Sequence, residues 1–198
     1  MGENDLTRNV SPRTINDDHL LVKRVQKGDQ DAFDDLVKQY YSSVYNLVAH
    51  SVRSHEERED LIQEVFIKVY RNLGKFRFEA SFSTWLFRIT RNMLIDRSRK
   101  KAIHPVSMES EEGGITIGDR VQDQRMNPEG FILESDSDIT LRDALMKLDE
   151  SHRNILVLRE MEGLSYMELA KILEINMGTV KSRLARAREE LKNLLMKN

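Results

Sequence analysis

The sequence contains no cysteine among its 198 residues, which excludes disulfide bonds, thiolate zinc sites and a thiol nucleophile. No apolar run approaches the ~18 residues of a membrane-spanning helix. Neither sign of charge dominates, because 31 basic and 33 acidic side chains leave a formal net charge of -2. A nucleic-acid-binding function therefore requires basic residues concentrated in particular segments. The lack of cysteine, and of an apolar signal segment in residues 1–16, favours a cytoplasmic protein.

Helical periodicity is the dominant pattern in the sequence. Apolar residues recur at steps of three and four, the spacing that places them on one face of an α-helix. Helices are expected from about Leu20 to Val25, over residues 33–48, 57–73 and 83–100, and in several segments after residue 141. No segment has a convincing alternating strand pattern. The sequence therefore predicts an all-α fold, with Asp29 capping the second helix and Gly74 ending the third.

Residues 103–137 interrupt this periodicity. The segment contains several glycines and prolines, many acidic residues and few basic ones. A structureless stretch of this length is uncommon inside a compact domain, so we interpret it as a flexible acidic linker, most simply a solvated tether. The predicted organisation is a flexible tail (1–16), a first helical domain (17–102), the linker (103–137) and a second helical domain (138–198).

A helix-turn-helix is predicted in the second domain. Ser165 and Glu168 have the spacing of a capping box at the start of a short helix. Residues 174–178 are expected to form the turn, with Gly178 at its tight corner, and a long recognition helix is expected to start near Thr179. Its apolar side would pack inward and its basic side would face outward, as insertion into a DNA major groove requires.

The expected recognition helix has no acidic residue between Thr179 and Arg188. A generic solvated basic helix is the simpler interpretation, but the capped short helix and the glycine turn before it favour DNA binding. Arg186 and Ser182 lie one turn apart, and we expect them to reach base edges. The other cations are better placed for phosphates: Lys181, Arg183 and Arg188.

A second cluster mixes aromatic and basic residues between Lys75 and Lys101. Aromatic rings beside a basic groove are typical of proteins that bind unpaired nucleic acid, because bases stack on the rings. Phe76 and Phe78 precede the expected helix and have less reason to be buried than Trp85. Trp85 falls on the core stripe, so packing explains it more simply than base stacking.

The helix of this cluster also has a polar face, on which Arg88, Arg91, Asn92 and Arg99 lie apart from the core stripe. The Asn92 carboxamide both donates and accepts hydrogen bonds, which suits the edge of an unpaired base.

The helix expected over residues 57–73 has an acidic outward face. Its buried side is expected to include Phe66 and Tyr70, while Asp60, Gln63 and Glu64 face outward. An acidic face does not bind DNA, so it is either solvated surface or a docking site for a basic protein. The residues alone leave both alternatives open.

Taken together, four segments resemble the extracytoplasmic-function (ECF) sigma factors of the sigma-70 family, and the sigma-E group in particular. The segments are 25–29 with 32–33, 60–66, 82–89, and 163–166 continuing through 178–183 to 186–188. The resemblance covers Leu20 to Leu195. It implies a sigma2-like helical bundle joined by the linker to a sigma4-like helix-turn-helix, and it implies transcription initiation, with a stress regulon expected.

The resemblance implies a role for each surface. Polymerase-binding residues would be Asp60, Gln63, Glu64 and Phe66. The minus-ten promoter element would be melted, and one base captured, by Phe76, Arg77, Phe78, Ser81, Arg88, Arg91, Asn92 and Asp96. The minus-thirty-five element would be read as duplex by Thr179, Lys181, Ser182, Arg183, Arg186 and Arg188. The linker would thread into the polymerase, where its acidic residues would stand in for nucleic acid.

The implied partners are core RNA polymerase (its clamp coiled coil and flap), promoter DNA and an anti-sigma factor. An anti-sigma factor of this family is often membrane-anchored and would hold the protein at the inner membrane face. No catalytic residue, metal, cofactor or small-molecule substrate is expected. The main alternative is a stand-alone helix-turn-helix regulator that binds operators as a dimer, although such a protein has no need for a single-strand platform. An enzyme is a distant third, without a residue constellation to support it.

Overall fold

The computed structural model of the chain describes residues 15–103 and 136–196, and in these ranges it contains helices and no strand. In chain order they are α1 (Ile15–Gln26), α2 (Gln30–Ala49), α3 (His55–Leu73), α4 (Phe82–Ile103), α5 (Asp136–Lys147), α6 (Glu150–Leu156), the π-helical turn η1 (Val157–Met161), α7 (Tyr166–Leu173) and α8 (Met177–Leu195). The all-α prediction is confirmed. The predicted tail (1–16) and linker (103–137) lie almost entirely outside the described residues.

The first four helices form a bundle whose connections follow from local chemistry. Gly28 has a φ of 96°, which lets the chain reverse between α1 and α2. Asp29 then caps α2, since its carboxylate accepts a hydrogen bond from the Ala32 amide at 3.2 Å. Arg24 donates to the same carboxylate at 2.8 Å, and both contacts lower the pKa of Asp29. The predicted cap is therefore confirmed.

A buried carboxylate joins α1 to α2. Asp18 is almost fully buried and accepts hydrogen bonds from the Gln39 amide at 2.7 Å and from the Tyr40 hydroxyl. A carboxylate removed from water in this way needs such donors, because an unpaired one would be strongly destabilising. The contact fixes the rotation of α1 on the bundle.

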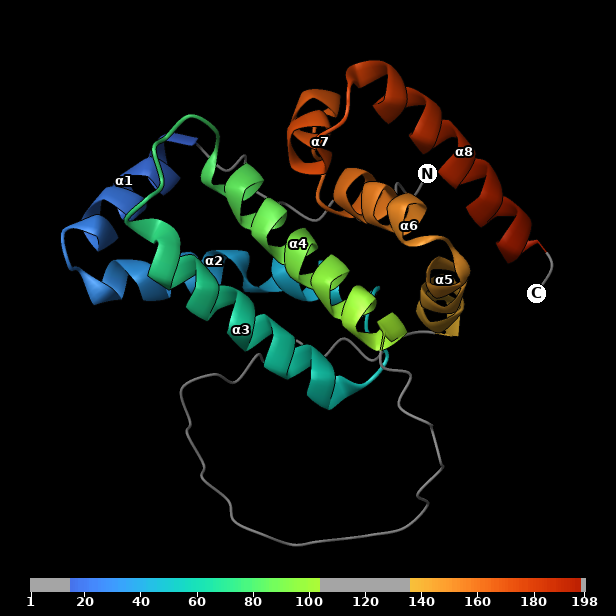
Figure 1. The fold of residues 1–198 in the computed structure, drawn as a ribbon, viewed down its shortest axis with the longest axis horizontal. Helices are drawn as coiled ribbons and strands as arrows, with labels where there is room; N and C mark the ends of the chain where they lie inside the picture. The colour runs from blue at the N-terminus through green and yellow to red at the C-terminus, as the bar shows by residue number, and fades with distance from the viewer. Residues whose placement is uncertain (1–14, 104–135, 197–198) are drawn as a thin grey trace, which may run out of the picture.

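Helix α4 is buried on more than one side. It packs against α2 and α3 in the first half of the chain and against α7 in the second half (Figure 1). Leu86, Phe87 and Thr90 are all fully buried as a result, and the Thr90 hydroxyl donates to the Leu86 carbonyl at 3.1 Å. Phe87 is thus a core residue and no part of an exposed aromatic platform, since α4 has a second packed face that a single core stripe does not predict.

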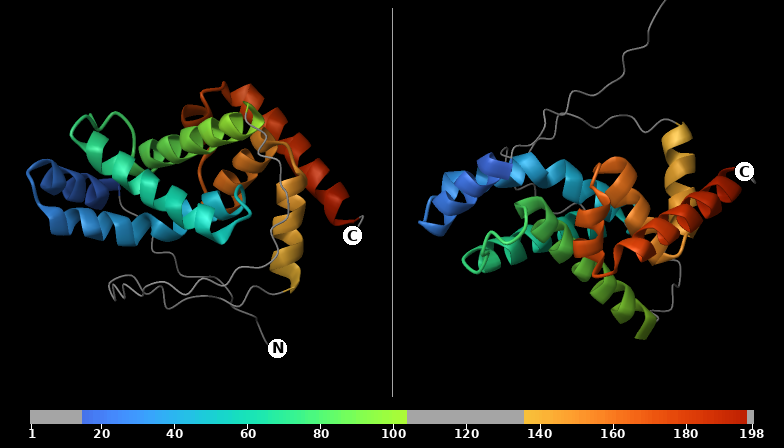
Figure 2. Two further views of the ribbon diagram at one scale, coloured as in Figure 1. Left: turned by 60° about the horizontal axis from the view of Figure 1, so that its bottom comes forward. Right: turned by 90° about the horizontal axis from the view of Figure 1, so that it is seen from above.

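The second half of the chain is built on α6 and α8, with α5 and α7 packed beside α8 (Figure 2). The predicted capping box is present at the start of α7. The Glu168 amide donates to the Ser165 hydroxyl at 3.3 Å, and the Glu168 carboxylate accepts from the Ser165 amide at 2.8 Å. Gly163, with a φ of 68°, turns the chain between η1 and α7.

The turn before the recognition helix differs from the prediction. Its left-handed residue is Glu174, with a φ of 56°, whereas Gly178 lies inside α8. Asn176 caps α8, because its side-chain oxygen accepts from the Thr179 amide at 2.8 Å. The helix therefore starts at Met177, two residues before the predicted start near Thr179. An asparagine cap outweighs the glycine signal here.

The two halves are in contact. Besides the packing of α4 on α7 (Figure 1), α2 packs against η1, and the Asn46 amide donates to the carboxylate of Glu162, directly after η1, at 3.2 Å. The buried apolar residues of both halves form one continuous cluster. The helix expected to bind the minus-ten element, α4, therefore packs against α7, the first helix of the helix-turn-helix.

Arg153 holds the end of α5 against α6. Its guanidinium donates to the carbonyls of Leu145, Met146 and Leu148 at 2.9, 3.0 and 2.8 Å. The Leu145 carbonyl also accepts from the Leu148 amide at 3.2 Å, and the cation supplies further donors at this end of α5, where no helical turn follows.

We expect Arg153→Ala to lower the free energy of unfolding by about 2–3 kcal/mol, because three acceptors lose a charged donor. Urea unfolding of the full chain measures the change, with Lys147→Ala as the matched exposed control. A loss no larger than that of the control would show that water replaces the guanidinium at no cost.

Candidate nucleic-acid and polymerase interfaces

The outward face of α8 carries the predicted duplex-binding residues. Val180, Leu184 and Ala187 are buried against the rest of the second half. The exposed residues of the predicted set are Lys181, Ser182, Arg186 and Arg188, while Thr179 and Arg183 are half-buried. The Thr179 amide and hydroxyl both donate to the Asn176 side chain, so Thr179 helps to form the helix cap.

Arg188 differs from the other cations of α8 because it already has a partner. Its guanidinium donates to the Glu160 carboxylate at 2.6 and 3.0 Å, and this contact raises the pKa of Arg188. Glu160 lies on η1, so the ion pair connects the recognition helix to the preceding element. The sequence could not predict this pairing, because the two residues lie 28 positions apart.

The loop between α3 and α4 is packed more tightly than predicted. Phe76 is only 6% exposed, and its ring contacts the rings of Phe78, Phe82 and Trp85 at centroid distances of 4.9, 6.2 and 5.3 Å. The expectation that Phe76 is exposed is wrong. Gln26 of α1 explains the difference, since it donates to the carbonyls of Leu73 and Phe76 at 2.9 and 3.1 Å and draws the loop onto the bundle.

The other predicted loop residues are more accessible. Arg77 is exposed and Phe78 is half-buried. The Ser81 hydroxyl accepts from the Thr84 amide at 3.2 Å, which is the geometry of a cap at the start of α4. In this structure Ser81 therefore sets where α4 begins.

The predicted polar face of α4 is divided between solvent and α7. Arg88, Asn92 and Asp96 are exposed. Arg91 is half-buried, and burial lowers its pKa, while the nearby carboxylates of Glu174 and Glu150 act in the opposite direction. One predicted minus-ten residue thus faces the second half of the chain.

The predicted polymerase-binding face lies on α3. Asp60, Gln63 and Glu64 are exposed there. Phe66 is 8% exposed and stacks on Tyr41 at a centroid distance of 6.5 Å, so the predicted burial is confirmed, while its polymerase-binding role stays a prediction. Its position on the apolar stripe already indicated burial.

Two apolar residues on this face were missed. Ile67 is 43% exposed and Tyr70 is 49% exposed, and with Gln63 they follow the one-face spacing of a helix. The prediction that Tyr70 is buried is wrong, because its ring meets the edge of Phe33 at 4.9 Å and otherwise lies at the surface. In the sequence, an isoleucine on an otherwise polar helix face was the signal that could have predicted this exposed apolar surface.

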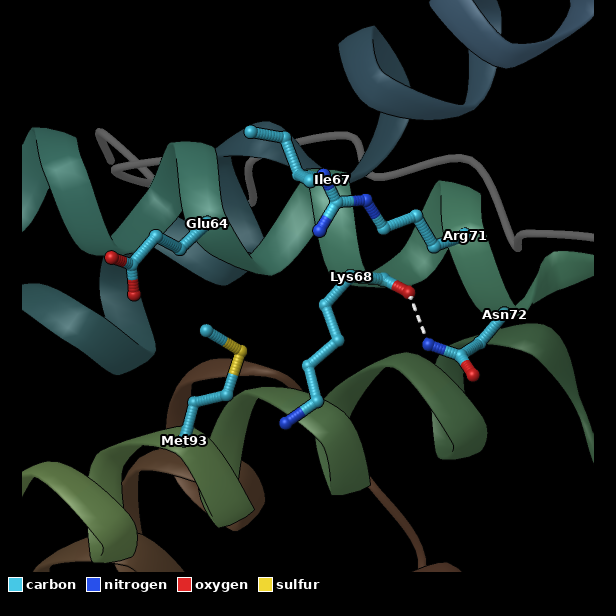
Figure 3. A pocket seen from close by; sticks show the side chains of 6 residues that line it. All are labelled: Glu64, Ile67, Lys68, Arg71, Asn72 and Met93. Carbon is cyan, nitrogen blue, oxygen red and sulfur yellow. Dashed lines mark hydrogen bonds between the residues drawn. The ribbon is translucent and has the colours of Figure 1, made fainter.

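A shallow groove of about 550 Å³ runs between α3 and α4, next to this face. Figure 3 shows Lys68 of α3 and Met93 of α4 extending across it, with Glu64 and Ile67 along the α3 side. The groove places charged and apolar side chains together beside the exposed face of α3.

The described residues contain neither a candidate membrane span nor a candidate metal-binding cluster. Within 15–103 and 136–196, no helix is long and apolar enough to cross a membrane. The same ranges hold no group of three or more histidine, aspartate or glutamate side chains arranged to bind a metal ion.

The chain matches known families over both halves. Residues 22–103 match Sigma-70 region 2, and residues 139–191 match Sigma-70 region 4. The RNA polymerase sigma-H factor of Pseudomonas aeruginosa is 39% identical over 186 residues, which cover 92% of this chain and 95% of the relative. The ECF RNA polymerase sigma factor SigW of Bacillus subtilis is 37% identical (88% and 94% covered), and the ECF RNA polymerase sigma-E factor of Escherichia coli K12 is 38% identical (89% and 93%).

Solved structures share the fold. CnrH in complex with the cytosolic domain of CnrY superposes with a TM-score of 0.66 at 23% identity, covering 92% of this chain and 99% of that one. RpoE of Bartonella quintana, in complex with the anti-sigma factor NepR, gives 0.62 at 24% identity, covering 83% and 96%. The two family matches and the relatives along nearly the whole chain establish its identity: it belongs to the ECF sigma factors of the sigma-70 family, which direct RNA polymerase.

Proposed function

We propose that this sigma factor positions polymerase by reading a minus-thirty-five element as duplex with α8, and that it opens a minus-ten element with α4 and the preceding loop. The observation that carries the proposal is the separation of surfaces along the chain. A capped helix exposes cations in the second half, an aromatic and basic loop lies in the first, and an acidic face lies on α3.

The duplex interface rests on α8. Its apolar side is fixed in the core, its first turn contains no acidic residue, and Lys181, Ser182 and Arg186 project into solvent. A helix presented in this way fits the major groove, where arginine pairs with guanine and serine accepts or donates. Arg188 contributes less, because Glu160 already neutralises it.

The single-strand interface rests on α4 and its loop. Arg77, Arg88 and Asn92 are exposed, and the ring of Phe78 is partly exposed. Cations attract the backbone, an aromatic ring stacks a base, and a carboxamide reads its edge. Phe76 and Ser81 act indirectly in this proposal, since the first supports the loop from the core and the second caps α4.

The polymerase interface rests on α3. Asp60, Gln63 and Glu64 supply a polar rim, and Ile67 with Tyr70 supplies the apolar centre that stable protein interfaces contain. We propose that this face binds the clamp coiled coil of core RNA polymerase and that the flap contacts the second domain.

Regulation by an anti-sigma factor is part of the proposal. CnrH was solved with a CnrY domain, and the Bartonella quintana RpoE with the anti-sigma factor NepR, and both share this fold. We propose that this chain acts in the cytoplasm on a stress regulon. A membrane-anchored anti-sigma factor would hold it there until a signal releases it.

Run-off transcription with purified core polymerase tests the whole proposal. We expect new start sites on genomic templates only when the protein is present. A protein that bound duplex DNA but produced no new transcript would instead be a stand-alone regulator.

Arg186→Ala tests the duplex interface. We expect it to weaken binding to the minus-thirty-five duplex by about 1–3 kcal/mol, because an exposed base-edge contact is lost. Arg188→Ala should cost less than about 1 kcal/mol, since its charge is already paired at the surface. Titration of holoenzyme on labelled duplex measures both, with Lys192→Ala as the control, and equal losses at the two arginines would contradict the assignment.

Tyr70→Ala tests the polymerase interface. We expect affinity for core polymerase to fall by about 1–2 kcal/mol, because a large aromatic anchor is removed. Competition binding to core polymerase measures the change, and Lys38→Ala, an exposed site on α2, is the control. An unchanged affinity together with normal folding would place the docking surface elsewhere.

A further inference from the structure

Phe78 has an unusual backbone conformation. Its φ of 60° lies in the left-handed region, and within residues 15–103 and 136–196 only Glu174 shares this among non-glycine residues. A bulky side chain is rarely found there, because its β-carbon crowds the following carbonyl. Such a conformation persists only where surrounding contacts favour it, and it is common at functional sites.

The contacts that hold Phe78 come largely from α1. The His19 ring meets the Phe78 ring edge-on at 5.0 Å and 81°, and the Lys23 ammonium lies 5.5 Å from the Phe78 centroid. Phe76 closes a third side at 4.9 Å and 67°. These are the favourable geometries for aromatic pairs and for a cation over a ring.

His19 and Lys23 lie four residues apart, so they share one face of α1. That face is fixed in place by two further contacts. Asp18 joins α1 to α2 through Gln39, and Gln26 joins α1 to the loop carbonyls. Helix α1, which is not part of the segment expected to bind DNA, therefore holds the loop in place.

The Phe78 ring is held without being fully covered. It stays half-buried, Arg77 beside it is exposed, and the Nε2 atom of His19 has no hydrogen-bond partner within the described part of the chain. A fixed, partly exposed ring with cations around it has the chemistry that stacks an unpaired base. Ordinary packing of a loop on a helix would require the same contacts but predicts no effect on strand binding.

We propose that His19 and Lys23 of α1 are positioning residues for single-strand binding, which hold Phe78 in its left-handed conformation as a preformed platform for one unpaired base. The inference rests on the proposed function of the loop between α3 and α4. It adds α1, which was not among the expected DNA-binding elements, and it assigns a function to the left-handed conformation of Phe78.

The experiment uses the full chain in holoenzyme. The probe is a single-stranded oligonucleotide of the non-template sequence upstream of a start site mapped by run-off transcription, with 2-aminopurine placed at each position in turn. We expect the fluorescence of one position to be quenched by wild-type protein. Phe78→Gly should remove the quenching and lower affinity about tenfold or more, as loss of one stacked base does.

His19 is tested by a cycle of variants. We expect His19→Ala to lower strand affinity about threefold to tenfold in the wild-type background, because it removes part of the base stacking that Phe78 provides. It should have no effect when Phe78 is already glycine, because the platform it supports is gone. His19→Phe, which keeps an edge-on ring, should restore binding, and Leu20→Ala, at an exposed site on the same helix, is the control.

Each outcome decides between the alternatives. Wild-type affinity for His19→Ala, or an equal loss in both Phe78 backgrounds, would overturn the positioning role. Urea midpoints of all variants, followed by the fluorescence of the only tryptophan, Trp85, separate loss of folding from loss of the platform. Failure of the wild-type holoenzyme to start transcription would instead overturn the proposed function itself.

Discussion

The position of α4 between two packed surfaces is the constraint on which the rest of the structure depends. Phe82, Leu86, Phe87 and Thr90 are all buried on this helix, which packs against α2 and α3 and also against α7. A helix enclosed in this way can expose only a narrow strip, which contains Arg88, Asn92 and Asp96. The core therefore decides which polar groups of α4 remain available to a ligand.

The exposed charges of this nearly neutral chain are separated between different helices. Acidic side chains are exposed on α3, and cations are exposed on α8 and on the strip of α4. Opposite potentials on different faces allow one small protein to approach a basic protein surface and a polyanion at once, in fixed orientation. The overall net charge of -2 conceals this arrangement.

Much of this could be predicted from local sequence signals. The cap at Asp29, the capping box at Ser165 and the bounds of α7 depend on residues within one helical turn, and the structure has them as predicted. The errors arise where distant residues decide. Gln26 of α1 holds the loop that buries Phe76. Glu160 forms an ion pair with Arg188. Asn176 caps α8, so that the helix starts two residues earlier than predicted.

The contact between α4 and α7 has a thermodynamic consequence for promoter binding. In the proposed function the chain spans two promoter elements about two helical turns, or roughly 70 Å, apart, and a chain that does so cannot keep these helices together. The free energy of the α4–α7 contact then subtracts from that of binding, and a closed population of about 99% would weaken the apparent affinity about 100-fold. By thermodynamic linkage, any molecule that prefers the closed arrangement would then oppose the proposed promoter binding without covering any of the proposed DNA-binding residues.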